Sequence, residues 1–449
     1  MPLQFTGSLQ ISKQLKAFQL SFIAMRLIYL FLLTVFSFAK ASVPPSETFQ
    51  YVNEGELGDY IVEYDGDYRV LPPFSAPFQL CFYNTTPNAY TLALRMGLTR
   101  SESLFRWVWE ANRGNPVREN ATLTFGSDGN LVLADADGRI AWQTNTANKG
   151  VTGFKVLPNG NMVLHDSEGN FIWQSFDYPT DTLLAGQSLR LGGATKLVSR
   201  ASAINNSDGP YSLVMESKAL VLYYKASNTP RPILYFNHEY WVNVRKGPLE
   251  YFKFDSTSED DEGTAYGLNL EYQVANSSTG GTLQIGRPNY NSTLSFLRLT
   301  MDGNLKVTFT LFSRDSFWGS ECQLPERCGK FGLCEDSQCV ACPSPNGLLG
   351  WSKDCDVKKL SSCNEKDFTY YKLEGVDHFM TTYTRGNAIK QDDCGNKCTR
   401  DCKCLGYFYN QETSRCWMAY DLKTLTRVAN STHVAFIKAP KNSNLSFSF

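Results

Sequence analysis

The chain has 449 residues with a formal net charge of −1, and 13% of its residues are aromatic. This length exceeds what one ordinary hydrophobic core supports, so we expect three or four units. The balanced charge offers no electrostatic footprint for nucleic acid, which excludes that class of partner.

The N-terminal segment has the pattern of a secretory signal. An apolar run of 12 residues from Leu27 to Phe38 precedes an A-x-A cleavage pattern at 39–41. This run is too short to cross a membrane, so residues 1–41 are predicted to be a signal peptide. The residues ahead of the run are atypically long for such a signal. We therefore expect translation to start at Met25 and the mature, secreted chain to begin near Ser42, with no later membrane span.

A repeat of two β units follows. Residues 122–145 read TLTFGSDGNLVLADADGRIAWQTN, and residues 153–176 read GFKVLPNGNMVLHDSEGNFIWQSF. In each unit, apolar and polar residues alternate between turn pairs such as Asp128-Gly129 and Asn159-Gly160, which predicts short strands joined by tight hairpins. A fixed period in short β units indicates stacking or radial arrangement around a shared core, and it excludes a doubly wound enzyme in this region.

Two further strings flank the repeat: WEANRGNP at 109–116 and WQSFDYPTDTLL at 173–184. Together with the repeat they resemble a plant bulb-type, mannose-binding lectin domain of the kind found in S-locus glycoproteins and S-domain receptor kinases. The resemblance covers 48–186 and implies a β-prism of three small antiparallel sheets. It implies a central tryptophan from each sheet, which are Trp109, Trp142 and Trp173. We expect them to pack in the core rather than stack on a sugar, because aromatic burial dominates small β cores.

The resemblance also implies sugar sites, each from one strand that carries Gln, Asp, Asn, Val and Tyr at every second position. Alternate residues share one face of a strand, so the polar groups converge on the sugar hydroxyls while Val packs on the ring carbons. The candidate carbohydrate-binding residues are Asp128, Asn130 and Val132 in the first repeat, and Asn159, Asn161 and Val163 in the second.

Both repeats depart from that pattern. Their Gln and Tyr positions are replaced, and the Asp position of the second repeat is Asn159. Losing two hydrogen-bonding anchors removes about 1–3 kcal/mol, whereas a millimolar monovalent site is worth only about −4 kcal/mol. We therefore favour hairpin-turn chemistry for these residues over mannose binding. A further echo at 300–308 falls in a second, more degenerate lectin-like domain expected at 190–312.

Twelve of the 13 cysteines lie between Cys322 and Cys416, a density that predicts a disulfide framework in a secreted chain. Zinc at the C-x-x-C of Cys339 and Cys342 is the less favoured alternative. Six cysteines fit an EGF-like module at 320–357, with no pairing assigned: Cys322, Cys328, Cys334, Cys339, Cys342 and Cys355.

The pattern CGNKCTRDCKC at 394–404 resembles a PAN/apple domain, a short helix clamped onto a curved sheet, over 363–438. The resemblance implies the disulfides Cys363–Cys402, Cys394–Cys416 and Cys398–Cys404. Cys81 is left over. A buried free thiol is the favoured interpretation, and an intermolecular disulfide is the alternative.

Glycosylation sequons agree with a secreted chain, and we expect those on loops to carry glycans. They begin at Asn84, Asn120, Asn205, Asn276, Asn291 and Asn430, with a seventh at Asn444. The last lies in a tail, 439–449, that is predicted to be disordered.

Enzyme motifs are not apparent. The histidines have no metal-ligand spacing, and no nucleophile-elbow or phosphate-binding loop appears. Asp177 and Asp181 could be read as a glycosidase pair, but a turn and packing role is favoured. The acidic run 259–262 lacks the alternating pattern of a calcium loop. We therefore predict a non-enzyme that needs neither cofactor nor metal.

The whole pattern predicts a mainly β chain of tandem β-prism domains followed by EGF-like and α+β PAN modules. This order resembles the plant epidermis-type secreted glycoproteins and implies a cell-wall or apoplastic protein that acts by binding, with cell-wall or mannose-type glycans as partners. The alternative is a soluble module, similar to a receptor ectodomain, that binds an extracellular protein in signalling or defence. A remoter option is an inhibitor of a hydrolase.

Overall fold

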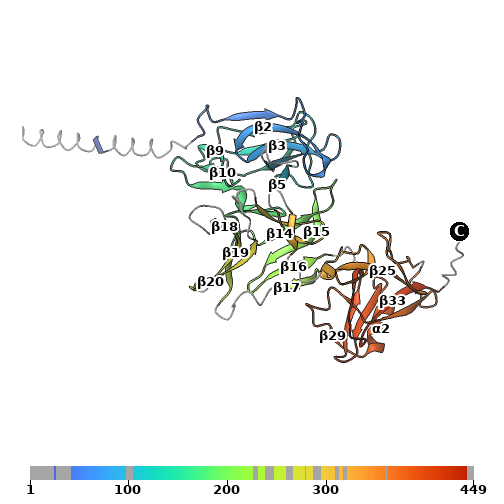
Figure 1. Ribbon diagram of the computed structural model, residues 1–449. Helices are drawn as coiled ribbons and strands as arrows, with labels where there is room; N and C mark the ends of the chain where they lie inside the picture. Colours follow the sequence, from blue (N-terminus) through green and yellow to red (C-terminus); the bar gives the residue numbers. More distant parts are fainter. Residues whose placement is uncertain are drawn as a thin grey trace, which may run out of the picture.

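The computed structural model forms three β-rich bodies in chain order (Figure 1). It describes residues 25–26, 42–97, 105–225, 231–237, 247–258, 266–278, 280–286, 295–308, 313–316, 321–360 and 362–441. Most of the expected signal peptide, the sequons at Asn291 and Asn444 and the acidic run 259–262 lie outside the described residues.

Three antiparallel sheets build the first body, with the strand orders β1-β6-β7-β8, β2-β3-β4-β5 and β9-β10-β11. Their strands are β1 (Phe49–Val52), β2 (Asp67–Ser75), β3 (Phe78–Asn84), β4 (Tyr90–Met96), β5 (Arg106–Glu110), β6 (Thr122–Phe125), β7 (Leu131–Ala134), β8 (Ile140–Gln143), β9 (Gly153–Val156), β10 (Met162–His165) and β11 (Phe171–Gln174). Two short 3-10 turns, η1 (Glu63–Asp65) and η2 (Ser175–Asp177), complete it. The predicted alternation is visible in β6, where Leu123 and Phe125 are buried and their neighbours are not.

The three central tryptophans meet edge to face. Trp109 of β5 lies 5.8 Å from Trp142 of β8 and 6.2 Å from Trp173 of β11, and the latter two are 5.8 Å apart between ring centroids. One ring from each sheet therefore closes the core, as a β-prism requires. Edge-to-face contacts are favourable aromatic geometry, so the tryptophans pack against each other as expected.

The second body repeats this plan with the sheets β12-β21-β22-β23, β13-β18-β19-β20 and β14-β15-β16-β17. Its strands are β12 (Thr182–Leu184), β13 (Ser188–Arg190), β14 (Lys196–Arg200), β15 (Asp208–Met215), β16 (Leu220–Tyr224), β17 (Ile233–Asn237), β18 (Leu249–Ser258), β19 (Tyr266–Val274), β20 (Gly280–Gly286), β21 (Phe296–Leu299), β22 (Leu305–Thr308) and β23 (Ser313–Ser316). The sequence placed this domain at 190–312. The sheets instead take in β12, which pairs with β21, and extend to β23.

The third body holds the EGF-like and PAN modules. Its elements are η5 (Glu321–Gln323), β24 (Phe331–Glu335), β25 (Gln338–Ser344), β26 (Gly347–Gly350), β27 (Phe368–Glu374), β28 (Val376–His378), β29 (Asn387–Ala388), α2 (Gln391–Arg400), β30 (Gly406–Asn410), β31 (Arg415–Ala419), β32 (Lys423–Arg427) and β33 (His433–Pro440). The helix α2 buries Cys394 and Cys398, one turn apart, against the sheet β27-β33-β30-β31-β29.

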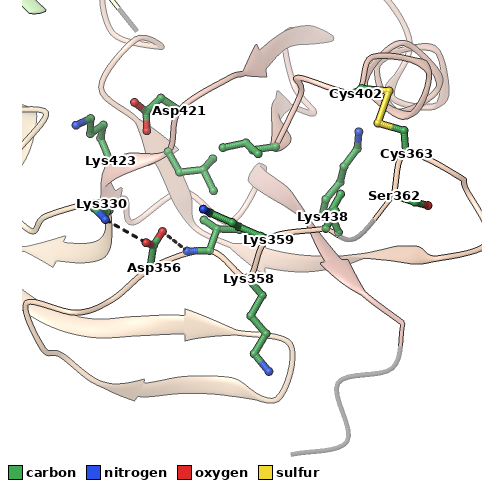
Figure 2. A pocket seen from close by; sticks show the side chains of 14 residues that line it. Lys330, Asp356, Lys358, Lys359, Ser362, Cys363, Cys402, Asp421, Lys423 and Lys438 are labelled. Carbon is green, nitrogen blue, oxygen red and sulfur yellow. Dashed lines mark hydrogen bonds and ion pairs between the residues drawn. A yellow bond between two sulfur atoms is a disulfide. The ribbon is translucent and has the colours of Figure 1, made fainter. Parts of the chain in front are cut away.

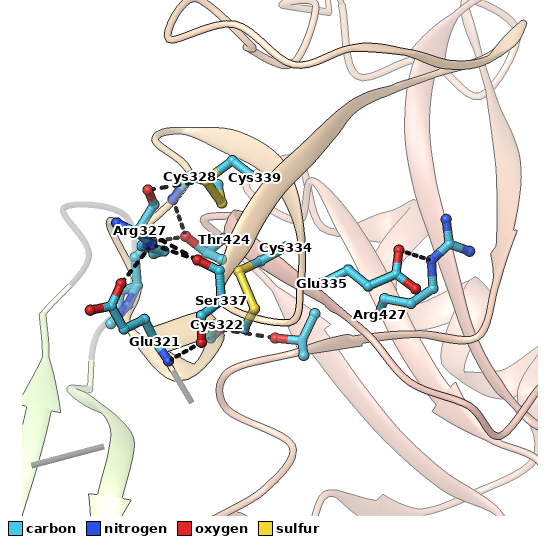
Figure 3. The surroundings of a disulfide bond; sticks show 12 residues. Glu321, Cys322, Arg327, Cys328, Cys334, Glu335, Ser337, Cys339, Thr424 and Arg427 are labelled. Atoms are coloured by element: carbon cyan, nitrogen blue, oxygen red, sulfur yellow. Dashed lines mark hydrogen bonds and ion pairs between the residues drawn. A yellow bond between two sulfur atoms is a disulfide. The ribbon is translucent and has the colours of Figure 1, made fainter. Parts of the chain in front are cut away.

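The EGF-like and PAN modules share one sheet, β26-β25-β24-β32-β28, because β24 pairs in parallel with β32. Thr424 of β32 accepts a hydrogen bond from the backbone N–H of Cys328 at 2.9 Å (Figure 3). Thr426 donates to the carbonyl of Cys322 at 3.0 Å. The sequence predicted two separate modules, whereas the structure joins them through backbone and side-chain hydrogen bonds.

Six disulfides staple this third body: Cys322–Cys334, Cys328–Cys339, Cys342–Cys355, Cys363–Cys402, Cys394–Cys416 and Cys398–Cys404. The last three are the pairs that the PAN resemblance implies. Cys81 is free and fully buried in β3, where burial raises the pKa of its thiol to about 12.

The strand β33 extends into the segment 439–449 that was predicted to be a tail. Ala439 and Pro440 belong to β33 and pair with Thr369 and Phe368 of β27, so the expectation of disorder from residue 439 was wrong for these positions. Backbone pairing of β33 with the edge strand β27 holds this end of the chain. Residues 442–449 lie outside the described part.

Candidate carbohydrate site

The candidate residues of the first repeat lie on the hairpin between β6 and β7. The Asp128 carboxylate accepts the backbone N–H of Asn130 at 3.0 Å, which closes the turn. Asn130 is buried, and its side-chain Nδ2 donates to Oε1 of Gln143 at 2.9 Å. Its Oδ1 accepts the N–H of Thr146 at 3.0 Å and the hydroxyl of Thr144 at 3.0 Å. Asn130 therefore ties the hairpin to the strand end that follows β8.

The second repeat has the same geometry. Asn159 accepts the backbone N–H of Asn161 at 3.1 Å, and Nδ2 of Asn161 donates to Gln174 at 2.8 Å. Oδ1 of Asn161 accepts the N–H of Phe176 at 3.2 Å. Recurrence at equivalent positions indicates that these bonds belong to the prism scaffold, because each satisfies a polar group that the fold buries.

The structure brings each trio together on its own hairpin, and the two trios lie in different sheets. Val163 is fully buried and Val132 is half-buried. Asp128 and Asn159 are exposed at the turns. This geometry accords with the favoured turn interpretation. Mannose binding at these residues stays a prediction.

An aromatic pocket of about 300 Å³ opens where the ends of β5, β8 and β11 meet. We define the aromatic pocket by Trp109, Glu110, Ala111, Arg113, Trp142, Gln143, Thr144, Asn145, Trp173, Tyr178 and Thr180, which line it. Trp109 and Trp173 are buried and form its base, while 57% of the Tyr178 surface is exposed. The Tyr178 ring stacks on Trp173 at 5.7 Å and 15°.

Hydrogen bonds fix the Tyr178 side of the aromatic pocket. The indole N–H of Trp109 donates to the carbonyl of Tyr178 at 2.9 Å, and the backbone N–H of Tyr178 donates to Ser175. Gln143 uses its Oε1 to accept from Asn130, while its amide Nε2 has no hydrogen-bond partner among the described residues. The equivalent Gln174 uses its Nε2 on Asp177. The aromatic pocket thus combines an exposed ring face with an available donor, a pairing that suits a sugar.

Charged residues behind this pocket are engaged in a buried network. Arg113 pairs with Glu110 at 3.1 Å and donates to the carbonyls of Val198 and Asn206 in the second body. Asp181 is buried and accepts the hydroxyl of Thr182 at 2.7 Å. Each charge has a nearby opposite charge or hydrogen-bond partner, as buried charges require.

Asp177, weighed above with Asp181 as a glycosidase pair, forms an ion pair with Arg190 and accepts from Gln174. Asp181 lies within 3.9 Å of both Arg113 and Arg298. Both carboxylates therefore have structural partners within the described residues.

The sequons differ in accessibility. Asn120, Asn205, Asn276 and Asn430 are exposed. Asn84 departs from the expectation of a loop site, because it ends β3 and only 7% of its surface is exposed. A glycan on Asn84 would have to be attached before this edge of the prism closes.

Comparison with known proteins shows which family this chain resembles. Residues 106–205 match the family of D-mannose binding lectin domains. Over the whole chain the similarity is wider: 55% identity to EP1-like glycoprotein 4 of Arabidopsis thaliana, covering 91% of this chain and 95% of that protein. Identity to the epidermis-specific secreted glycoprotein EP1 of Daucus carota is 58%, covering 78% and 96%. The chain belongs to the EP1-like glycoprotein family, and it is a lectin-like extracellular protein.

More distant relatives match over a smaller share of their own length. A G-type lectin S-receptor-like serine/threonine-protein kinase, SD2-5 of Arabidopsis thaliana, is 27% identical over 74% of this chain and 40% of the kinase. Among solved structures, a two-domain, fetuin-binding agglutinin of Scilla campanulata shows 14% identity with a TM-score of 0.20, an overlap too small to inform the fold.

Within the described residues, no helix is long and apolar enough to span a membrane, and no cluster of three or more potential metal ligands appears. The sequence did not predict that Tyr178 and Gln143 line a pocket. The similar spacing of the three tryptophans was the available signal, since it predicts that the three strand ends meet.

Proposed function

We propose that this chain is a non-enzymatic glycan-binding protein of the plant cell wall and apoplast, and that the aromatic pocket of its first prism holds the sugar. The observation that carries the proposal is the exposed Tyr178 ring, which stacks on Trp173 and lines the same pocket as Gln143, whose amide Nε2 has no partner among the described residues. A sugar ring would lay its C–H face on Tyr178 while a hydroxyl accepts from Gln143. Mannose-type and wall glycans are the partners we expect.

The hairpin residues have a supporting role in this proposal. Asn130 orients Gln143 by binding its Oε1, which directs the remaining amide donor of Gln143. The residues conserved from the mannose pattern would thus position the aromatic pocket rather than contact the sugar themselves. This proposal assigns the sugar to a place different from the strand face that the lectin resemblance implies.

The test compares glycan binding by the full chain with binding by Tyr178→Ala. A glycan array identifies the ligand, and calorimetry measures its affinity. Loss of a ring contact worth about 1.4 kcal/mol weakens binding about tenfold. Phe171→Ala is the matched control, because Phe171 is an exposed aromatic of the same prism that does not line the pocket. Unchanged affinity in Tyr178→Ala, with loss in Asp128→Ala, would return the site to the hairpin strand.

A second function, protein binding, is favoured by one surface. Val340, Leu348, Leu349 and Trp351 are all exposed on and beside β25 and β26, and β26 is the edge strand of its sheet. Exposed apolar residues that cluster on one hairpin are typical of protein contacts. If the array detects no glycan for any form of the chain, an extracellular protein partner at this hairpin becomes the preferred function.

A further inference from the structure

A cleft of about 630 Å³ lies between the EGF-like and PAN modules. We define the lysine cleft by Lys330, Asp356, Val357, Lys358, Lys359, Leu360, Ser362, Cys363, Cys402, Leu405, Asp421, Leu422, Lys423 and Lys438, which line it. Figure 2 shows its lysines on three sides: Lys330 and Lys423 on one, Lys358 and Lys359 on the connecting segment, and Lys438 beside the Cys363–Cys402 disulfide.

Positive charge exceeds negative charge in the lysine cleft, because five lysines and two aspartates line it. Lys330 pairs with Asp356 at 3.3 Å, and Lys423 pairs with Glu326. Lys358 and Lys359 are exposed and have no ion-pair partner among the described residues. A concave surface with an excess of one sign of charge concentrates field lines and attracts ligands of opposite charge.

Lys438 adds a buried cation at the rear of the cleft. Only 2% of its surface is exposed, and its Nζ donates to the carbonyls of Cys398 at 2.7 Å and Asp401 at 3.1 Å. These carbonyls end helix α2, where the helix dipole favours a positive charge. Carbonyls do not neutralise an ammonium group, so the positive field of Lys438 persists at this end of the cleft.

The chemistry of the lining narrows the class of ligand. Every basic side chain in the lysine cleft is a lysine and none is an arginine. Lysine acts as a hydrated point charge that pairs with an anionic group without fixed bidentate geometry, so the lysines select for negative charge and the apolar lining must supply the rest of the specificity. Between the lysines lie the half-buried aliphatic side chains of Val357, Leu360 and Leu405, which suit the C–H faces of a saturated ring.

We propose that the lysine cleft binds a carboxylate-bearing polysaccharide, with the free ammonium groups of Lys358 and Lys359, which lie on opposite sides of the connecting segment, pairing separate uronate carboxylates and the aliphatic floor contacting the sugar rings. This second site is independent of the aromatic pocket, because it lies in a different body of the chain. An extracellular, lectin-like protein that binds by contacts in two places gains avidity on a polymer. An acidic peptide is the rival ligand, and it lacks the saturated rings that the floor accommodates.

The experiment measures binding of the full, disulfide-bonded chain to polygalacturonate by biolayer interferometry. We expect binding that weakens as salt is raised, since exposed charge pairs are screened. Fully methyl-esterified polygalacturonate keeps the rings but loses the charge, and polyglutamate keeps the charge but loses the rings. Both are expected to bind at least about tenfold more weakly.

The variant Lys358→Gln/Lys359→Gln should weaken polygalacturonate binding about tenfold, because it removes both unpaired ammonium groups. The matched control is Lys149→Gln/Lys155→Gln, which removes the same charge from exposed lysines of the first prism. All four side chains are exposed, so we expect both variants to fold, and neutral-glycan binding at the aromatic pocket should be unchanged in the cleft variant. Equal affinity for polyglutamate, an equal effect of both double variants, or no binding of polygalacturonate would each overturn the proposal.

Discussion

Arg298 of the second prism pairs with Glu63 of the first, 235 positions away in the sequence, with 2.8 Å between Nη1 and Oε1. Nε of Arg298 also donates to Thr182 at 2.9 Å, and another donor of the same guanidinium reaches the carbonyl of Trp107. Both charged side chains are buried. The pair therefore holds the two prisms in one arrangement, because separating them would leave two buried charges without their partners.

Arg298→Met should lower the free energy of unfolding by about 3–5 kcal/mol, since it leaves the Glu63 carboxylate buried without its main partner. Urea denaturation measures the change. Arg106→Gln is the control: Arg106 also pairs with Glu63, at 3.0 Å, but is partly exposed and should cost only about 0–1 kcal/mol. The double variant Glu63→Gln/Arg298→Met should recover part of the loss. Equal costs for Arg298→Met and Arg106→Gln would contradict the account.

Asn130→Ala should destabilise the first prism by about 1–3 kcal/mol, because it leaves the buried N–H of Thr146 without an acceptor. Asp128→Ala removes one exposed turn bond and should cost only about 0.5–1.5 kcal/mol. Thermal unfolding followed by tryptophan emission reports the difference. A smaller effect at Asn130 than at Asp128 would show that the buried network is not what holds this hairpin.

The shared sheet predicts that the EGF-like and PAN modules unfold together. Thr424→Val removes the hydroxyl that bonds Cys328 and Pro325, so it should lower the stability of the third body by about 1–3 kcal/mol. Hydrogen exchange should then rise in β24 as well as in β32. Thr369→Val, on the exposed face of β27, is the matched control. Faster exchange confined to the PAN strands would mean that the modules are independent.

His378 predicts a loss of stability in acid. Burial lowers the pKa of His378 from its ordinary 6.5 to about 3, and its Nδ1 accepts the N–H of Met380 at 3.3 Å. In the unfolded chain His378 becomes protonated below pH 6.5, whereas in the folded chain it stays neutral until the pH approaches 3. Stability is therefore complete above pH 6.5 and falls as the pH drops through this window. His378→Gln should have a flatter pH–stability curve there, and an unchanged slope would exclude His378 as the cause.

Much of the fold was predictable because the repeat carries its own turn and strand signals. The period of the tryptophans located the prism centre, and the spacing of Cys394 and Cys398 predicted their common helix face. The shared sheet was not predictable, since the parallel pairing of Phe331 with Lys423 joins segments 92 residues apart and leaves no local pattern. The predicted start of the second prism was wrong for the same reason, because β12 pairs with β21, which is distant in the sequence.

The candidate site was only partly accessible from sequence. Alternation placed Asp128, Asn130 and Val132 along one hairpin, but alternation cannot tell whether a polar side chain faces a ligand or a neighbouring strand. Burial of Asn130 and its bond to Gln143 depend on the strand end after β8. The aromatic pocket forms where three separate motifs of the sequence converge, and the lysine cleft forms where unrelated segments meet, so no single contiguous pattern predicts either of them.

Tryptophan emission during glycan titration tests the central claim most directly, because Trp109, Trp142 and Trp173 line the aromatic pocket. We predict that a glycan selected on the array changes the emission with the same midpoint as calorimetric binding, and that Tyr178→Ala shifts both midpoints together while Phe171→Ala shifts neither. Calorimetric binding with unchanged emission, or a midpoint unaffected by Tyr178→Ala, would contradict the proposal that the first prism holds its sugar in this pocket.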